Sequence, residues 1–184
     1  MFNKLLVVGI MIIFVLSIAG YTADEPEYIG ANKCKTCHNA DKNGAQFKKW
    51  SATKHSEAYE ALKSDGAKKK AEIAGVKDPL KDQKCLSCHT TAFGAKNLAT
   101  SYKIEEGVTC EACHGAGSKY KTLSIMKDHK KSVAAGMVDK VDDKVCATCH
   151  KKDTPGHEGK FTTFEKEFAK IAHPVPAEND RRIK

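Results

Sequence analysis

A five-residue unit, Cys-x-x-Cys-His, occurs four times in this chain of 184 residues and accounts for all eight of its cysteines. It is the attachment signature of c-type haem: two thiols add to the porphyrin vinyl groups, and the following imidazole becomes the proximal iron ligand. The sequence therefore predicts four covalently bound haem c groups. They would be attached to Cys34, Cys37, Cys85, Cys88, Cys110, Cys113, Cys146 and Cys149, with proximal ligands His38, His89, His114 and His150.

Disulfide bonds and zinc sites are the other common uses of paired cysteines. A disulfide framework does not need a histidine after each pair. A zinc protein can use Cys-x-x-Cys pairs, but it also needs no histidine fixed after every one. Because all four pairs carry this histidine, the pattern favours haem over both alternatives.

Residues 1–23 have the features of a secretory signal peptide. Lys4 gives a short positive region, Leu5–Ala19 is mainly apolar, and small residues follow, so we expect cleavage near residues 19–23. The alternative is an uncleaved anchor, but the apolar run is short for a span of about 20 residues. We expect export by a Sec-type signal to the periplasm or beyond, with no stable membrane span after cleavage.

The remaining segment, residues 24–184, has the length of a single domain. With about 40 residues per haem, side chains alone have little apolar surface to bury, so the haems must supply much of the core. We expect a mainly α fold with much irregular loop: a small multihaem cytochrome c fold built around four packed haems. A flexible C-terminal tail is expected from about residue 177.

The formal net charge of +8 comes almost entirely from lysine, since Arg181 and Arg182 are the only arginines. Proteins that read nucleic acids usually interleave arginine and aromatic residues in a basic patch. This sequence has no such pattern, so we expect no nucleic-acid partner. Haem propionates would offset most of the positive charge. The expected partners are redox proteins. A solvated lysine surface is the simpler interpretation of the basic charge, and attraction of an acidic redox partner by the lysines is the more specific one.

Apolar periodicity predicts helices that carry further histidines. Gly44–Leu62 is expected as one amphipathic helix with His55 on its apolar face. Residues 118–135 are expected as another, with His129 on the apolar face and Gly136 as the C-terminal cap.

Three further segments complete the expected secondary structure. Residues 67–74 form a lysine-rich helix, and residues 91–107, which have no clear period, form a loop. A stripe of phenylalanines predicts a helix from Phe161 to Ile171 that ends before Pro174.

Four histidines lie outside the motifs, and their number allows four bis-histidine haems of low potential. His55 and His129 belong to expected helices, and His173 closes the last one; an ordinary core histidine is the alternative, but four irons need partners. His157 lies in a loop rich in glycine and proline, where an exposed surface histidine is an equally good interpretation. Methionine is the other common sixth ligand, but we expect Met126 in the core.

Several stretches resemble the tetrahaem cytochrome c-554 family of ammonia-oxidising bacteria, whose members accept electrons from hydroxylamine oxidoreductase. The resemblance covers nearly the whole mature chain in order. It rests on Lys33–His38, Trp50–His55, Gly107–Gly117 and Lys127–Lys130, followed by the fourth motif and a C-terminal histidine.

The resemblance also implies a ligand set. His129 would pair with His38 at the first haem, His173 with His114 at the third, and His55 with His150 at the fourth. The second haem, on His89, would be five-coordinate and high-spin. This chain departs from the family in being shorter after the fourth motif and in having His157, which matches no family ligand. We expect an open or weakly closed second haem, because helix-borne ligands are better fixed than loop-borne ones.

Three functions fit these features. The leading one is an exported electron-transfer protein between redox partners, with no catalytic residues. The second is an enzyme that reduces a small nitrogen oxide, such as nitric oxide or hydroxylamine, at a five-coordinate second haem. The third is a subunit of a polymeric cytochrome filament. The sequence leaves the oligomeric state and the identity of the partners open.

Overall fold

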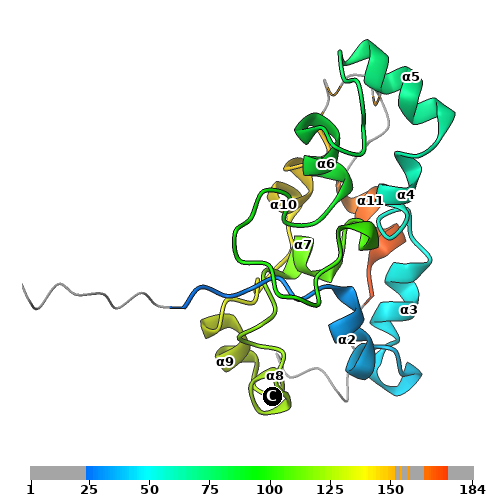
Figure 1. Ribbon diagram of the computed structural model, residues 1–184. Coiled ribbons are helices and arrows are strands. Elements are labelled where there is room, and N and C mark those ends of the chain that lie inside the picture. The colour runs from blue at the N-terminus through cyan, green and yellow to red at the C-terminus, as the bar shows by residue number, and fades with distance from the viewer. Residues whose placement is uncertain (1–23, 152–153, 155–156, 158–163, 174–184) are drawn as a thin grey trace, which may run out of the picture.

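The structure is a computed structural model that describes residues 24–151, 154, 157 and 164–173. The predicted signal peptide, Phe161, Pro174 and the C-terminal tail lie outside these residues. Figure 1 shows short helices joined by irregular loops, with α5 at one end of the molecule and α8 and α9 at the other. In the described part of the chain there is no strand, only an isolated bridge between Tyr28 and Leu98. The expected mainly α fold with much loop is confirmed.

The helices are short, and four of them carry the attachment motifs. Those four are α2 (Ala31–His38), α6 (Gln83–His89), α7 (Cys110–His114) and α10 (Asp143–Ala147), the last being followed by Thr148, Cys149 and His150. The others are α3 (Gln46–Ser51), α4 (Ala58–Ala61), α5 (Asp65–Ile73), α8 (Leu123–Met126), α9 (His129–Ala134) and α11 (Phe164–Ile171), with 3-10 turns η1 (Asp41–Asn43) and η2 (Ile104–Glu106).

The prediction of one helix over Gly44–Leu62 is wrong. The chain forms α3, then a turn over residues 52–57, then α4. His55 therefore lies in a turn and not on the apolar face of a helix.

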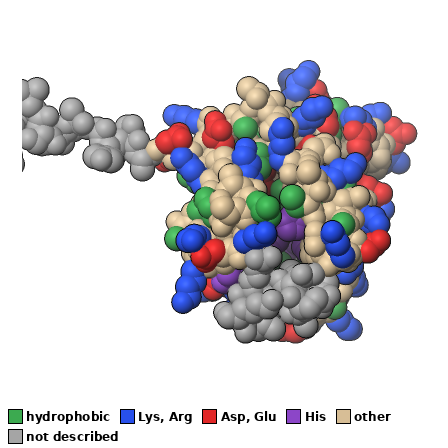
Figure 2. Space-filling model, turned by 90° about the horizontal axis from the view of Figure 1, so that it is seen from below, with side chains coloured by type: hydrophobic (Ala, Val, Ile, Leu, Met, Phe, Trp, Pro, Cys, Tyr) green, Lys and Arg blue, Asp and Glu red, His purple; other side chains and the backbone are tan. Residues whose placement is uncertain are grey.

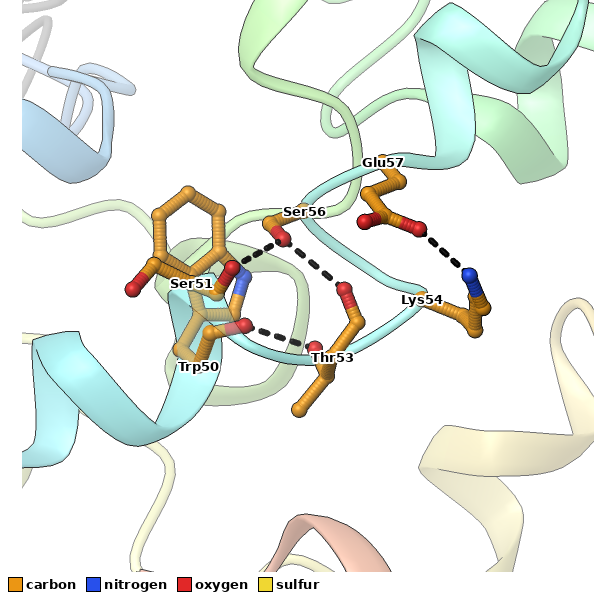
Figure 3. Close-up of polar contacts among 6 residues, drawn as sticks. All are labelled: Trp50, Ser51, Thr53, Lys54, Ser56 and Glu57. Atoms are coloured by element: carbon orange, nitrogen blue, oxygen red, sulfur yellow. Dashed lines mark hydrogen bonds and ion pairs between the residues drawn. The ribbon is translucent and has the colours of Figure 1, made fainter.

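Side-chain hydroxyl groups explain this interruption. The Thr53 hydroxyl donates to the carbonyl of Trp50 at 2.7 Å. The Ser56 hydroxyl donates to the carbonyls of Thr53 at 2.8 Å and Ser51 at 3.1 Å (Figure 3). Serine and threonine hydroxyls that bond nearby carbonyls offer the backbone an alternative to helical hydrogen bonds. Apolar periodicity does not register this competition.

The prediction of one helix over residues 118–135 is also wrong, because the segment forms the two short helices α8 and α9. Asp128 interrupts it: its carboxylate accepts a hydrogen bond from the Lys131 N–H at 3.1 Å and caps the N-terminus of α9. His129 is the first residue of that helix. Gly136 follows the C-cap residue with a φ of 100°, the left-handed conformation that the predicted cap requires.

The remaining expected elements are present in the described residues. The lysine-rich helix is α5, which begins slightly earlier than predicted because Ser64 caps it by accepting from the Ala67 N–H at 3.1 Å. Helix α11 covers the described part of the phenylalanine stripe, and the rings of Phe164 and Phe168 stack with centroids 5.0 Å apart. No helix in the described part of the chain has both the length and the apolar character to cross a membrane.

Few apolar side chains are fully buried in the described part of the chain. They are Ile29, Ala31, Leu62, Ala71, Val76, Leu86, Ala116 and Tyr120. A protein-only core this small fits the expectation that haems complete it.

Glu111, inside the third motif, provides a polar anchor for this core. Only 3% of the residue is exposed. Its carboxylate accepts hydrogen bonds from the N–H groups of Ile29 at 2.9 Å, Gly30 at 2.8 Å and Gly117 at 2.7 Å. The carboxylate therefore fastens the segment that leads into α2 onto the third motif.

Candidate haem-binding sites

The first and third motifs lie side by side. Helix α2 packs on α7. The thiols of Cys34 and Cys110 interact, and this interaction raises the pKa of Cys34 and lowers that of Cys110. All eight cysteines lie in the described part of the chain, and none is in a disulfide.

The fourth motif lies between the third and the second. Burial and then the neighbouring Cys146 thiol are the main causes that raise the pKa of Cys113 to about 11. Cys149 interacts with Cys88 through its thiol, and its sulfur lies 3.9 Å from the carbonyl oxygen of Ser87. The attachment thiols of successive motifs are therefore electrostatic neighbours in the order first, third, fourth, second.

Three proximal histidines each face a histidine from a distant part of the chain. The ring centroids of His55 and His150 lie 6.0 Å apart with an interplanar angle of 63°. Those of His114 and His173 lie 6.1 Å apart at 61°. The first pair joins the turn between α3 and α4 to the fourth motif, and the second joins the third motif to the end of α11. Both match the pairs that the family resemblance implies.

The third such pair joins His89 of the second motif to His157. Their ring centroids lie 5.9 Å apart at 62°. The resemblance implies no partner for His89, so this contact departs from the expectation of an open second haem.

The ring separations fit an iron held between two imidazoles. Metal–nitrogen bonds of about 2.0–2.1 Å on both sides, together with the half-width of each ring, put the centroids roughly 6 Å apart. The thiol pair that precedes each proximal histidine supplies the covalent attachment. The residues present therefore fit haem c at these positions.

Hydrogen bonds orient several of these rings. His89 Nδ1–H donates to the carbonyl of Ala58 at 2.7 Å, and His173 Nδ1–H donates to that of Ile171 at 2.9 Å. A carbonyl can only accept, so each bond fixes the proton on Nδ1 and leaves Nε2 available to a metal. His38 makes the corresponding contact with Gln46 Oε1 at 3.3 Å.

Burial favours the neutral form of these imidazoles, which is the form that binds a metal. Burial, with a smaller contribution from His173, lowers the pKa of His114 to about 4. It also lowers the pKa values of His55 and His89.

A cavity beside the third motif contains one of the ring pairs. The Trp50 indole N–H donates to the carbonyl of Val108 at 2.8 Å and fixes one wall. The cavity is lined by Trp50, Thr53, His55, Val108, Thr109, Cys110, Cys113, His114, Ile171 and His173.

His129 does not face His38: among the described residues there is no ring contact between these two histidines. Its Nε2 lies 2.9 Å from the Asp139 carboxylate. Asp139 is therefore a partner of His129 that the sequence did not indicate.

Gly107 is another residue that sequence reasoning missed, although it stands within one of the stretches that carry the resemblance. Its φ is +72°, and a Cβ there would lie 2.8 Å from the carbonyl oxygen of His55. The neighbouring Val108 N–H donates to that same carbonyl at 2.9 Å. The chain leading into the third motif therefore holds the turn that carries His55.

Figure 2 shows histidine side chains in a recess of one face, bordered by hydrophobic side chains, with lysine and acidic side chains interspersed around it. Many lysines form exposed ion pairs three residues apart, such as Lys54 with Glu57 at 2.7 Å and Lys68 with Asp65 at 2.8 Å. Such pairs contribute little to stability, because water and salt screen exposed charges. This face therefore has a mixed and solvated charge pattern.

Comparisons with known proteins find related sequences. Residues 33–115 match the model of the family described as cytochrome c554 and c-prime. The chain is 35% identical to cytochrome c-554 of Nitrosomonas europaea over 129 residues, which is 65% of this chain and 49% of that protein. The chain thus spans about half the length of the curated relative it matches. No solved structure matches it.

The family match begins just before the first motif and ends just after the third, so it includes the contact between those motifs and the turn that carries His55. By this sequence match and the identity to cytochrome c-554, this part of the chain is similar to the cytochrome c-554 family.

Proposed function

We propose that this protein is an exported tetrahaem c-type cytochrome that transfers electrons between redox partners. Residues 33–115 match a family of c-type cytochromes, which carry covalently bound haem c. The count of four rests on the four complete motifs. The single observation that best supports the function is that proximal histidines of the third and fourth motifs each face a second histidine ring at about the spacing that an iron between them requires.

The order in which the attachment thiols neighbour one another suggests a route for electrons. A haem attached at each motif would neighbour the next in the order first, third, fourth, second. The first and second haems would then be the terminal ones, where electrons enter or leave. The chain's own contribution is to fix the positions, the axial ligands and the burial of the cofactors, which set their potentials.

The proposed ligands are the four motif histidines and three histidines from elsewhere. His55 would complete the fourth haem, His173 the third and His129 the first. The ring pairs support the first two assignments. At the first haem, His129 would bind through Nδ1, because its Nε2 is paired with Asp139. Histidine on both sides of an iron favours a low potential, so we expect low-potential haems.

Export to the periplasm or beyond is proposed from the signal-like residues 1–23 and from the chemistry of haem attachment. The partners are proposed to be redox proteins that bind transiently. Their interfaces would be small, as is usual for electron-transfer complexes.

Protein-film voltammetry of the purified holoprotein tests this function. We expect reversible reduction by four electrons per chain at low potential, with no catalytic current when nitric oxide or hydroxylamine is added. A catalytic current would instead support the nitrogen-oxide reductase. Gel filtration of the same sample tests the filament, because a polymer would elute far ahead of a monomer.

A further inference from the structure

We infer that His157 is the sixth ligand of the second haem, so that in this chain the iron on His89 is closed to small molecules. This inference rests on the proposed function, since it requires a haem at the second motif. Its basis is the ring contact between His89 and His157, with centroids 5.9 Å apart and an interplanar angle of 62°.

The geometry of this contact is the same as that of the two helix- or turn-borne pairs. All three separations lie between 5.9 and 6.1 Å, and all three angles between 61° and 63°. In each pair, one member directly follows an attachment cysteine and the other comes from a different segment. The pair at the second motif therefore has what an axial ligand pair needs.

The ordinary alternative is a surface histidine that meets His89 by chance. His157 is exposed, so water can form hydrogen bonds with its ring nitrogens. Burial therefore does not explain why its ring lies against another imidazole. His89 is already oriented by its Nδ1–H bond to the carbonyl of Ala58 at 2.7 Å. That bond directs the other ring nitrogen away from Ala58 and leaves it available to a metal.

Chain connectivity brings His157 to the second motif. It follows His150 by seven residues, and the fourth motif already touches the second, since the Cys149 sulfur lies 3.9 Å from the carbonyl oxygen of Ser87. The His157 N–H donates to the carbonyl of Thr154 at 3.0 Å. One short segment thus supplies the proximal ligand of the fourth haem and the distal ligand of the second.

The consequence concerns the reactivity of the second haem. An iron with two histidines has no free position for nitric oxide, carbon monoxide or hydroxylamine. The second haem would then act in electron transfer alone, in contrast to the five-coordinate haem that the resemblance implies.

The test compares the wild-type holoprotein with His157→Ala and with Thr154→Ala, a control in the same loop that keeps the backbone bond to His157. Intact mass first establishes the number of haems in each. High-spin haems are then counted by electron paramagnetic resonance, and carbon monoxide is titrated into the reduced proteins.

We expect His157→Ala to contain one more high-spin haem and to bind one more carbon monoxide per chain than the wild type. Added imidazole should reverse both changes, and Thr154→Ala should match the wild type. His157→Met should mature with the wild-type low-spin count and a raised potential at one haem, because methionine can replace the ligand. The Met variant gives a second measurement should the Ala variant fail to mature.

An unchanged high-spin count in His157→Ala would overturn the inference, as would His157→Met with an unchanged set of potentials. A wild-type mass showing fewer than four haems would be a different failure: it would contradict the tetrahaem proposal itself.

Discussion

The carboxylate of Glu111 accepts two hydrogen bonds from the backbone N–H of Ile29, at 2.9 and 3.0 Å. It joins the segment before the first motif to the middle of the third motif. The two motifs whose sulfurs are in contact are therefore held together by a buried polar group and not only by the cofactors.

Replacing this carboxylate should destabilise the protein strongly. Glu111→Ala leaves three backbone N–H groups without their acceptor, and each buried unsatisfied donor costs about 1–3 kcal/mol. We expect a loss of roughly 3–5 kcal/mol in the free energy of unfolding, measured by scanning calorimetry of the holoprotein. Glu105→Ala, at an exposed position, is the control and should change the stability little. Equal melting temperatures for the two variants would contradict the anchoring role.

Gly107→Ala should displace the turn that carries His55, although Gly107 is not itself a ligand. The new Cβ would lie 2.8 Å from the carbonyl oxygen of His55, so the turn that carries this histidine must move. We expect Gly107→Ala to lower the free energy of unfolding by about 1–3 kcal/mol more than the same substitution at a strained but uncrowded glycine. A new high-spin haem signal should accompany this loss. The matched control is Gly94→Ala, where φ is also positive, at +80°, and nothing lies within 4 Å of the new Cβ. Similar results for both variants would show that backbone strain alone is responsible.

His55→Ala should convert one low-spin haem to high-spin, because His150 would lose the ring that faces it. Electron paramagnetic resonance should show one more high-spin haem per chain than in the wild type. Lys54→Ala is the neighbouring control, since the Lys54 side chain is 95% exposed and only pairs with Glu57. The assignment fails if His55→Ala keeps the wild-type spin count.

His129 and Asp139 should affect the first haem in different ways. His129→Ala should produce a high-spin haem. Asp139→Asn should keep the haem low-spin but raise its potential, because the ligand loses the carboxylate that increases its basicity. Redox titration followed by optical spectra measures both effects. A low-spin, unshifted first haem in both variants would remove His129 from the ligand set.

Haem loading should follow the motifs one by one. The mature wild type should exceed the mass of its processed chain by four haems. Replacing both cysteines of one motif with alanine, as in Cys85→Ala with Cys88→Ala, should remove one haem mass. A fully matured wild type with three haems or fewer would disprove the count.

The sequence by itself determined the features that depend on neighbouring residues. Attachment and proximal ligation need two cysteines and a histidine within five residues, so each motif can be read without knowing the fold. The mainly α fold with much loop also followed from apolar periodicity and from the absence of strand patterns. The cap at Gly136 was predictable because one residue must adopt the left-handed conformation after α9.

The tertiary structure decided which distant histidines meet. Helix periodicity placed His55 and His129 on long helices, but hydroxyl–carbonyl bonds at Thr53 and the cap at Asp128 break both segments. The pairing of His157 with His89, and of His129 with Asp139, depends on how loops return across the motifs. No local pattern records such contacts, because they arise only when the chain packs around its attachment sites.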